Sequence, residues 1–311
     1  MENMILRPLG DKDVPDFCDM LYSSFNAWYW KHGWGRNYFS CRPQETAIFF
    51  DIYNDLTPDC NVAVFDSQTG RLMGSCFYHP REHHVSLGIM SVHPNYFGRG
   101  VGKALIDQIL AFVRSNNYRS CRLVGSAINM DSFSLYNRAG FVPRVSYHDM
   151  VLTVPQAGMA VSTPGEDRVR DAVHADVQGM GELEMAVSSI RREVDYRYAI
   201  DNPRGCLHAS VHENDQGGID GFMLSLKHPA LNMLGPCVAA SEEIAVALIR
   251  RELDRFRGEW ALFLIPMDKR QMVETMYEWG ARNVETHLKQ VWGHFVPIEG
   301  VSMPSFLPET G

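Results

Sequence analysis

The sequence lacks the features that mark membrane, secreted and nucleic-acid-binding proteins. It has no apolar run near the roughly 18 residues that a membrane span needs, and no basic, apolar leader, so neither a span nor a signal peptide is expected. Lys and Arg number 29 against 37 Asp and Glu, which argues against a nucleic-acid partner. The seven cysteines include no Cys-x-x-Cys pair, and an odd number suits free thiols in a reducing cytoplasm.

The acidic excess lies entirely in the second half of the chain. Residues 1–155 carry 14 basic and 14 acidic side chains, and the remaining residues carry 15 and 23. This balance mildly favours a cationic substrate, although an acidic surface also serves solubility alone. With 311 residues, the chain is long enough for two domains with cores of their own.

A glycine-rich segment between Val92 and Leu105 is the most informative part of the chain. It reads VHPNYFGRGVGKAL and joins an apolar run, Val85–Val92, to an amphipathic helical pattern that begins at Val101. A strand, a glycine turn and a helix N-terminus in this order direct backbone N–H groups at an anion. Glycine lets a phosphate approach those N–H groups, and Arg99 and Lys103 add positive charge. The segment predicts a pyrophosphate site.

Two common nucleotide-binding motifs do not fit this segment. The Walker pattern needs Ser or Thr after its lysine, whereas Ala104 follows Lys103. The dinucleotide pattern needs a third glycine where Lys103 stands, and no acidic residue closes a following strand at the expected distance.

The segment resembles the coenzyme A loop of the GNAT acetyltransferase superfamily, in which Arg/Gln-x-x-Gly-x-Gly/Ala follows a strand ending in Val-x-Pro. Val92-His93-Pro94 and Gly98–Gly102 match, while Phe97 stands where the family usually has Gln or Arg. A second motif of the family is similar to Asn129–Phe141: an Asn, a short helix ending in Leu-Tyr, and then Gly-Phe. Two motifs in the right order make the resemblance far more specific than a glycine loop alone.

The resemblance implies an α/β protein of the α+β type, with two GNAT-like domains, each a mixed, mostly antiparallel sheet flanked by helices. Residues 1–153 are expected to form the first domain, and residues 154–166 have the composition of a linker. Residues 167–311 repeat the order of elements, starting with a helical segment at Gln178–Ile200.

The second domain is expected to be degenerate. Ala239–Glu243 stands in place of the glycine loop, with no glycine and two carboxylates that would repel a pyrophosphate. Aligning Gly280 with Gly140 puts Met276 opposite Tyr136. We therefore expect this domain to bind no coenzyme in the same manner.

The resemblance implies that acetyl-CoA is the co-substrate and that no metal takes part. Tyr136 is expected to protonate the departing thiolate, and a backbone N–H of Leu87–Val92 to stabilise the oxyanion. The coenzyme contacts are expected to come from the strand, the loop and the following helix. The expected coenzyme-binding residues are Ile89, Met90, Ser91, Val92, Phe97, Gly98, Arg99, Gly100, Val101, Gly102, Lys103, Asn129, Ser132 and Tyr136.

The sequence leaves the general base open. Many family members carry a glutamate at the position of Ser86, and serine cannot serve alone. The candidates are Glu82, His83 and His84, just upstream, or His93, each acting through water.

An aromatic segment near the N-terminus is the expected acceptor pocket, because the first two helices of the family cover the acceptor. Phe25, Trp28, Tyr29 and Trp34 suit an apolar or cationic amine. The alternative is that these rings pack the helix against the sheet or the second domain.

Together these features predict a cytoplasmic N-acyltransferase that moves an acetyl group to the primary amine of a small molecule. The alternatives are a protein N-terminal or lysine acetyltransferase and a non-catalytic coenzyme A sensor. We expect a monomer or homodimer with no nucleic-acid or membrane partner. His79, His83 and His84 lack a matching cluster at metal-ligand spacing, so no metal is expected.

Overall fold

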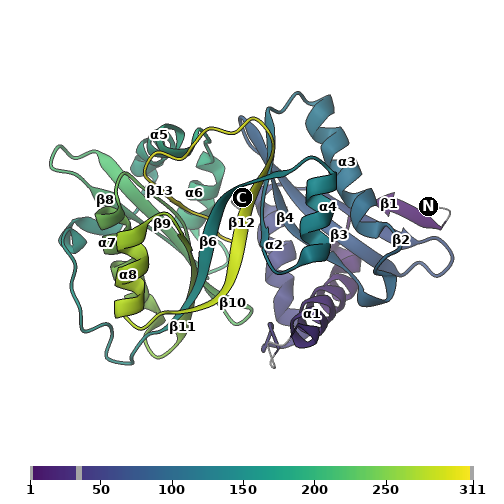
Figure 1. Ribbon diagram of the computed structural model, residues 1–311, viewed down its shortest axis with the longest axis horizontal. Helices are drawn as coiled ribbons and strands as arrows, with labels where there is room; N and C mark the ends of the chain where they lie inside the picture. The colour runs from purple at the N-terminus through teal and green to yellow at the C-terminus, as the bar shows by residue number, and fades with distance from the viewer. Residues whose placement is uncertain (1–2, 33–36, 309–311) are drawn as a thin grey trace.

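One sheet of 13 strands runs through the whole molecule in the computed structural model, which describes residues 3–32 and 37–308 (Figure 1). The strands of the first half are β1 (Met4–Arg7), β2 (Asn61–Asp66), β3 (Leu72–Pro80), β4 (His84–Val92), β5 (Ser120–Ser126) and β6 (Val142–Thr153). Those of the second half are β7 (Val169–Asp171), β8 (Leu207–Glu213), β9 (Ile219–His228), β10 (Leu231–Ala239), β11 (Trp260–Pro266), β12 (Arg282–Gly293) and β13 (Val301–Met303).

Each half carries four α-helices against its strands. The first half has α1 (Val14–Lys31), α2 (Ala47–Leu56), α3 (Val101–Ser115) and α4 (Met130–Arg138). The second half has α5 (Val177–Ser188), α6 (Glu193–Asp201), α7 (Glu242–Leu253) and α8 (Arg270–Glu278). None of the described helices is both long and apolar enough to cross a membrane.

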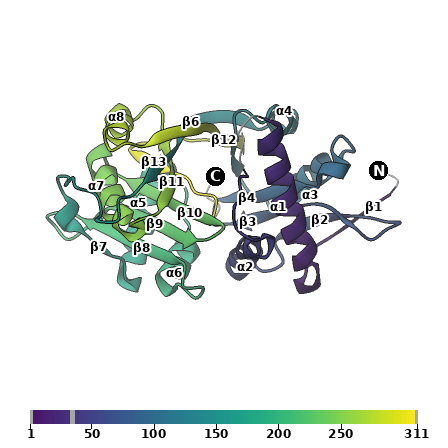
Figure 2. The same cartoon turned by 90° about the horizontal axis from the view of Figure 1, so that it is seen from below.

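The two halves exchange their long strands. The order β5-β12-β6-β11 places β12 between two strands of the first half and β6 between two strands of the second (Figures 1 and 2). Met150 and Leu152 of β6 therefore belong to the same apolar core as α7 and α8. Because each half supplies a strand that the other needs, the sheet is continuous across the molecule.

Helices cover both faces of this sheet. The helices α1, α2, α5 and α6 share one core cluster, which includes Phe17 and Tyr53 from the first half and Val177 and Tyr196 from the second. On the other face, α3 and α4 pack on the first half, and α7 and α8 on the second. The first face, called here the shared face, is thus built by both halves.

The expected α+β class and mixed, mostly antiparallel sheet are confirmed. Among the strands of the described residues, only the pairs β4–β5 and β10–β11 are parallel. The helical segment expected at Gln178–Ile200 is two helices, because Ser189 adopts a left-handed conformation with φ of 56°. The connecting segment 154–166 is held by Arg250, whose guanidinium donates to the carbonyls of Val161 at 2.6 Å and Met159 at 3.0 Å.

Candidate functional site

In the first half, the strands β4 and β5 separate after a short paired stretch, and the gap between their backbones is called here the slot. The two strands pair in parallel only through His84–Ser120, Val85–Cys121 and Ser86–Arg122. Beyond Ser86, a β-bulge shifts the register of β4 against β3, and Gly88 suits it because a Cβ there would lie 2.9 Å from Phe77 Cβ. The backbone of Leu87–Val92 is left to face the slot, where an extended ligand can pair with it as an added strand.

The glycine loop at the start of α3 presents backbone amides to open space. Gly98 and Gly100 have φ of 74° and 83°, and a Cβ at either position would meet nothing within 4 Å. Within α3, Ala104 N–H donates to the carbonyl of Gly100 at 3.0 Å, so the N–H groups before it point out of the helix end. Strand edge, loop and helix end together fit the extended arm and diphosphate of a coenzyme A.

The side chains of Phe97, Arg99 and Lys103 in the loop are exposed. Phe97 is 52% exposed, and its ring cannot replace the polar side chain that the family pattern has there. The guanidinium carbon of Arg99 lies 5.4 Å from the centroid of the Tyr96 ring. Lys103 is exposed and forms an ion pair with Asp107. The loop therefore offers an anion mainly its backbone amides.

The second motif brings Tyr136 to the end of β5. Asn129 caps α4, because its side-chain oxygen accepts the N–H of Ser132 at 3.1 Å. Tyr136 is buried, and its Cε2 would lie 3.6 Å from a Cβ on Gly125. The phenol therefore approaches β5 from the face that carries α3 and α4.

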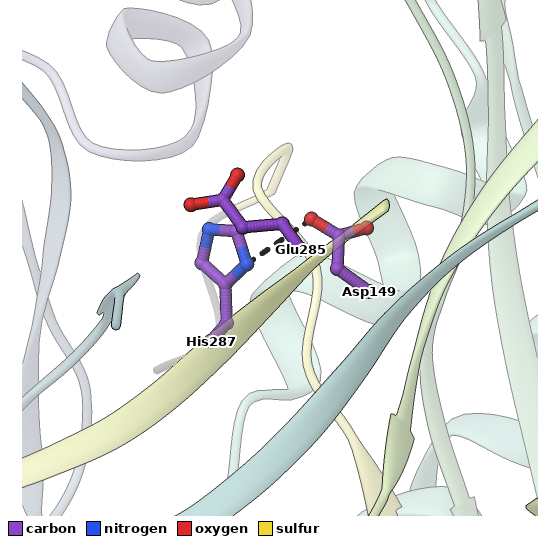
Figure 3. A group of neighbouring side chains, drawn as sticks. All are labelled: Asp149, Glu285 and His287. Atoms are coloured by element: carbon purple, nitrogen blue, oxygen red, sulfur yellow. Dashed lines mark ion pairs between the residues drawn. The ribbon is translucent and has the colours of Figure 1, made fainter. Parts of the chain in front are cut away.

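An acidic cluster lies at the same end of β5, on the shared face, and is formed by Asp149, Glu285 and His287 (Figure 3). Asp149 stands opposite Glu285 in the pairing of β6 with β12, and His287 stands opposite Ser126 of β5. The exchanged strand β12 thus carries two of the three side chains into the first half.

Glu285 is held by hydrogen bonds from both sides. The phenol of Tyr29 in α1 donates to Glu285 Oε2 at 2.8 Å, and the hydroxyl of Ser126 donates to Oε1. His287 Nδ1 lies 3.1 Å from Asp149 Oδ2, so these two side chains form a charge pair when the imidazole is protonated. The carboxylate of Glu285 is thereby fixed beside the slot.

The buried setting shifts the pKa values of this cluster. Burial raises the pKa of Glu285, and hydrogen bonds from Ser126 and Tyr29 oppose that shift only in part. Burial lowers the pKa of His287, but the neighbouring Asp149 carboxylate outweighs it and the net pKa is raised. A carboxylate whose pKa is raised is a stronger base than an ordinary surface glutamate.

The same three residues could hold a metal ion, since their ligand atoms lie within 4.8 Å of one another. One histidine and two carboxylates suit a divalent cation. However, both oxygens of Glu285 already accept hydrogen bonds, and His287 already has Asp149 beside it. The cluster therefore has partners of its own, and the absence of a metal stays a prediction.

The other candidate bases are placed differently. Ser86 is buried where the slot begins, and His84 is fully buried with a pKa that burial lowers well below its usual value. Glu82 is exposed in the β3–β4 hairpin, where its carboxylate lies 3.4 Å from His83. The hairpin is at the opposite end of β4 from the slot, so the structure does not bring Glu82 to Tyr136.

The residues of the aromatic segment that was expected to form the acceptor pocket also lie in different places. Tyr29 reaches the acidic cluster, whereas Trp28 stacks on His32 with centroids 4.1 Å apart. Phe25 is half-buried, packs on Tyr38 and lies against the core. Trp34 lies outside the described residues.

Sequence reasoning missed Asp149, Glu285 and His287. The spacing of Glu285 and His287 puts both on one face of a strand, which was a readable signal. Nothing in the sequence indicates that this strand pairs with β5 of the other half.

The corresponding region of the second half is closed. β13 pairs with β10 through Cys237–Met303, Val238–Ser302 and Ala239–Val301, in the gap that β10 and β11 would otherwise leave. Ser241 caps α7 by accepting the N–H of Ile244 at 3.4 Å. Ala281 N–H donates to Met276 O at 2.9 Å, as Phe141 N–H donates to Tyr136 O at 3.0 Å, so buried Met276 takes the place of Tyr136.

Comparisons with known proteins match both halves. A family described as "Acetyltransferase (GNAT) family" matches residues 22–141, and one described as "Acetyltransferase (GNAT) domain" matches residues 200–293. A search of curated protein sequences gave no significant match.

Solved structures share the fold of the entire chain at low sequence identity. A putative acetyltransferase from Pyrococcus horikoshii has 17% identity and a TM-score of 0.74, with 97% of this chain and 92% of that chain covered. A GCN5-related N-acetyltransferase from Sphaerobacter thermophilus has 14% identity and a TM-score of 0.63, covering 96% and 98%. A tandem GNAT protein from the clavulanic acid biosynthesis pathway has 14% identity and a TM-score of 0.62, covering 93% and 98%.

Proposed function

The chain belongs to the GNAT acetyltransferase superfamily as a tandem protein with two GNAT domains, and we propose that it acetylates the primary amine of a small molecule by direct attack on acetyl-CoA. It is a GNAT-type N-acetyltransferase, and the family uses acyl-CoA. The acetyl donor, the small acceptor and the residue roles given below are our proposals.

The positions of Tyr136 and Glu285 support direct attack. Tyr136 packs against Gly125 from the face of α3 and α4, and Glu285 contacts the next residue, Ser126, from the shared face. Acyl transfer from a thioester needs a proton acceptor on the side of the amine and a proton donor on the side of the sulfur. The slot between β4 and β5 ends between these two groups.

The proposed reaction accounts for each proton transferred and for each bond made or broken. Acetyl-CoA, when bound, supplies the activated acyl carbon. Glu285 accepts the proton that the amine loses as its nitrogen bonds to that carbon. A backbone N–H of β4 between Ile89 and Ser91 stabilises the oxygen that gains charge, and Ser24 holds Ser91 through its hydroxyl. Tyr136 donates its phenolic proton to the sulfur as the carbon–sulfur bond breaks.

The first domain, residues 1–153, would bind the coenzyme, and the second, residues 167–311, would bind none. Three features support this division of work. β13 occupies the gap beside β10, Ser241 caps the start of α7, and Met276 stands at the place of Tyr136. In this view the second domain contributes β12, and with it the base of the first domain's site.

Substitution of Glu285 tests the proposed function. Glu285→Gln should lower kcat about 10²- to 10⁴-fold in an assay of thiol release with a panel of small amines, while the KM for acetyl-CoA changes little. Glu82→Gln is the matched control, because that carboxylate is exposed in the hairpin, and it should retain the wild-type rate. A fully active Glu285→Gln enzyme would remove Glu285 as the base, and release of no thiol with any amine would contradict the transfer itself.

A further inference from the structure

A second group of buried ionisable side chains lies on the shared face, at the other end of the β12 stretch that carries Glu285. Arg122 of β5 is 4% exposed and Lys289 of β12 is 1% exposed. The pairings Ser86–Arg122 and Val124–Lys289 put both on one face of the sheet, together with His84 two residues before Ser86. Acetyl transfer as proposed above uses neither cation.

These cations have fewer anionic partners than they need. Arg192, between α5 and α6, forms a buried ion pair with Glu184, which also accepts the phenol of Tyr196. Arg122 donates only to the Ser120 hydroxyl, at 3.4 Å, and no carboxylate among the described residues pairs with Lys289. Because Asp195 is paired with Arg81, Glu184 is the carboxylate left for these three buried cations.

Several polar atoms around the cations also lack partners among the described residues. All of these atoms are buried. They belong either to strand residues whose side chains point to the shared face or to Arg192. These atoms are both ring nitrogens of His84, the hydroxyls of Ser86 and Tyr147, and Nη1 of Arg192. Buried polar groups are nearly always hydrogen-bonded, so these atoms offer hydrogen-bonding capacity to a polar ligand or to water.

The pKa shifts distinguish Arg192, which has a carboxylate partner, from Arg122 and Lys289, which have none in the described part of the chain. The neighbouring Glu184 outweighs burial and raises the pKa of Arg192. Burial, together with Arg122 and Arg192, lowers the pKa of Lys289 to about 7, and burial lowers that of Arg122 to about 10. An unpaired buried charge is costly, and such groups gather at binding sites.

A cavity of about 480 Å³ lies between the two halves, next to one member of this buried group. It is lined by Arg81 and Glu82 of the β3–β4 hairpin, by Tyr118, and by Arg191 and Arg192. Arg81 is already paired with Asp195, and Arg191 with Glu193. Arg192 is thus the residue that belongs both to the cavity and to the buried group.

We propose that Arg122, Lys289 and Arg192 form a binding site for a carboxylate or phosphate group. The group belongs either to the amine acceptor itself, which rests on the proposed function, or to a free anion. Lys289 is four residues from Glu285 on the same face of β12, or about 13 Å along the strand. An acceptor with an amine at one end and an anionic group at the other can therefore contact both.

The site itself is tested by thermal unfolding in inorganic phosphate against sodium chloride of equal ionic strength. Phosphate at about ten times its Kd should raise the Tm of the wild type by about 2 °C. Lys289→Met and Arg122→Gln should lose this shift, whereas Lys227→Met, at an exposed lysine paired with Glu259, should keep it. Equal Tm values in phosphate and chloride, or a full shift in both site variants, would overturn the proposal.

Kinetics separate the two sources of the anion. If it belongs to the acceptor, an ω-amino acid should have a kcat/KM at least ten times that of the alkylamine of equal length. Phosphate should then compete with it, and Lys289→Met should remove the preference. If a free anion binds, the two amines should react equally, and phosphate should change the rate without competing. Phosphate binding without acetylation of any amine would reject the proposed function and leave the anion site standing.

Discussion

Tyr136 and Glu285 come from different halves of the chain and meet at two neighbouring residues of β5. The rigid strand fixes both, since the phenol packs on Gly125 and the carboxylate accepts from Ser126. Proton transfer depends on such placement, because a donor or acceptor acts only within hydrogen-bond reach. Effects of single substitutions here should therefore fall on kcat rather than on binding.

Removal of the Tyr136 hydroxyl is expected to slow turnover. Tyr136→Phe should lower kcat about 10²- to 10⁴-fold, because the departing thiolate then lacks its proton donor. The KM for acetyl-CoA should change little, as the ring still packs. Tyr277→Phe is the control, since Tyr277 lies next to Met276 in α8 and is exposed. Steady-state assays of both variants measure kcat, and an unchanged kcat of Tyr136→Phe would exclude Tyr136 as the proton donor.

The buried Lys289 predicts an unusual dependence of stability on pH. Its pKa of about 7 in the folded protein lies below the ordinary 10.5, because burial, Arg122 and Arg192 outweigh Glu184. Between these pH values the unfolded chain binds more protons, so the stability of the wild type rises with pH. The cost of burying Lys289 is complete below pH 7 and vanishes above pH 10.5.

Lys289→Met is therefore expected to stabilise the anion-free protein at pH 7, by roughly 2–5 kcal/mol. The gain should shrink steadily as the pH rises from 7 to 10. Urea unfolding of both proteins at three pH values measures it. A variant equally stable as the wild type at pH 7, or a gain that grows with pH, would contradict the buried, unpaired state of Lys289.

At the scale of elements, the loop before α3 combines a left-handed glycine with free amides at a helix end. Gly100→Ala is expected to raise the Kd for acetyl-CoA about ten-fold or more, because φ near 83° strains alanine and shifts the amides. Gly205→Ala introduces similar strain at φ of 70°, in the loop between α6 and β8 of the second half. Calorimetric titration of both variants compares them. Equal Kd values would argue that the loop does not bind the coenzyme.

Local elements were predictable because their signals lie within a few residues. The strand β4, the loop glycines, α3 and α4 follow from apolar periodicity, turn residues and caps. The position of Tyr136 near the end of α4 was also predictable, from the Leu-Tyr and Gly-Phe pattern. The break between α5 and α6 was missed, because the buried Arg192–Glu184 pair that accompanies it is a tertiary contact.

The site as a whole was only half predictable. The motif predicts coenzyme-loop residues from Phe97 to Lys103. In contrast, Glu285, His287 and Lys289 lie in the first half only because β12 is exchanged, and strand pairing over such a distance leaves no local pattern.

At the scale of the whole molecule, strand exchange makes the two domains depend on each other. β12 fills the place beside β5, and β6 supplies Met150 and Leu152 to the second core. Neither half alone can then complete its sheet. In the proposed mechanism, the acidic second half takes part in catalysis through a strand rather than through a coenzyme site.

Separate expression of residues 1–163 and 164–311 tests this dependence. Each half alone should lack the cooperative thermal transition of the whole chain, and coexpression should restore both the transition and acetyl-CoA binding. Circular dichroism and size-exclusion chromatography provide the measurement. Independent folding of residues 1–163, with acetyl-CoA affinity equal to that of the whole chain, would show that the exchange is dispensable.

The central claim is that one acyl-CoA binds per chain, on the backbone amides of the first half, while β13 closes the second. Isothermal titration of the whole protein with acetyl-CoA measures this directly. We predict a stoichiometry of one, with binding weakened by Gly100→Ala and unchanged by Gly205→Ala. A stoichiometry of two, or no heat of binding at several salt concentrations, would contradict the account.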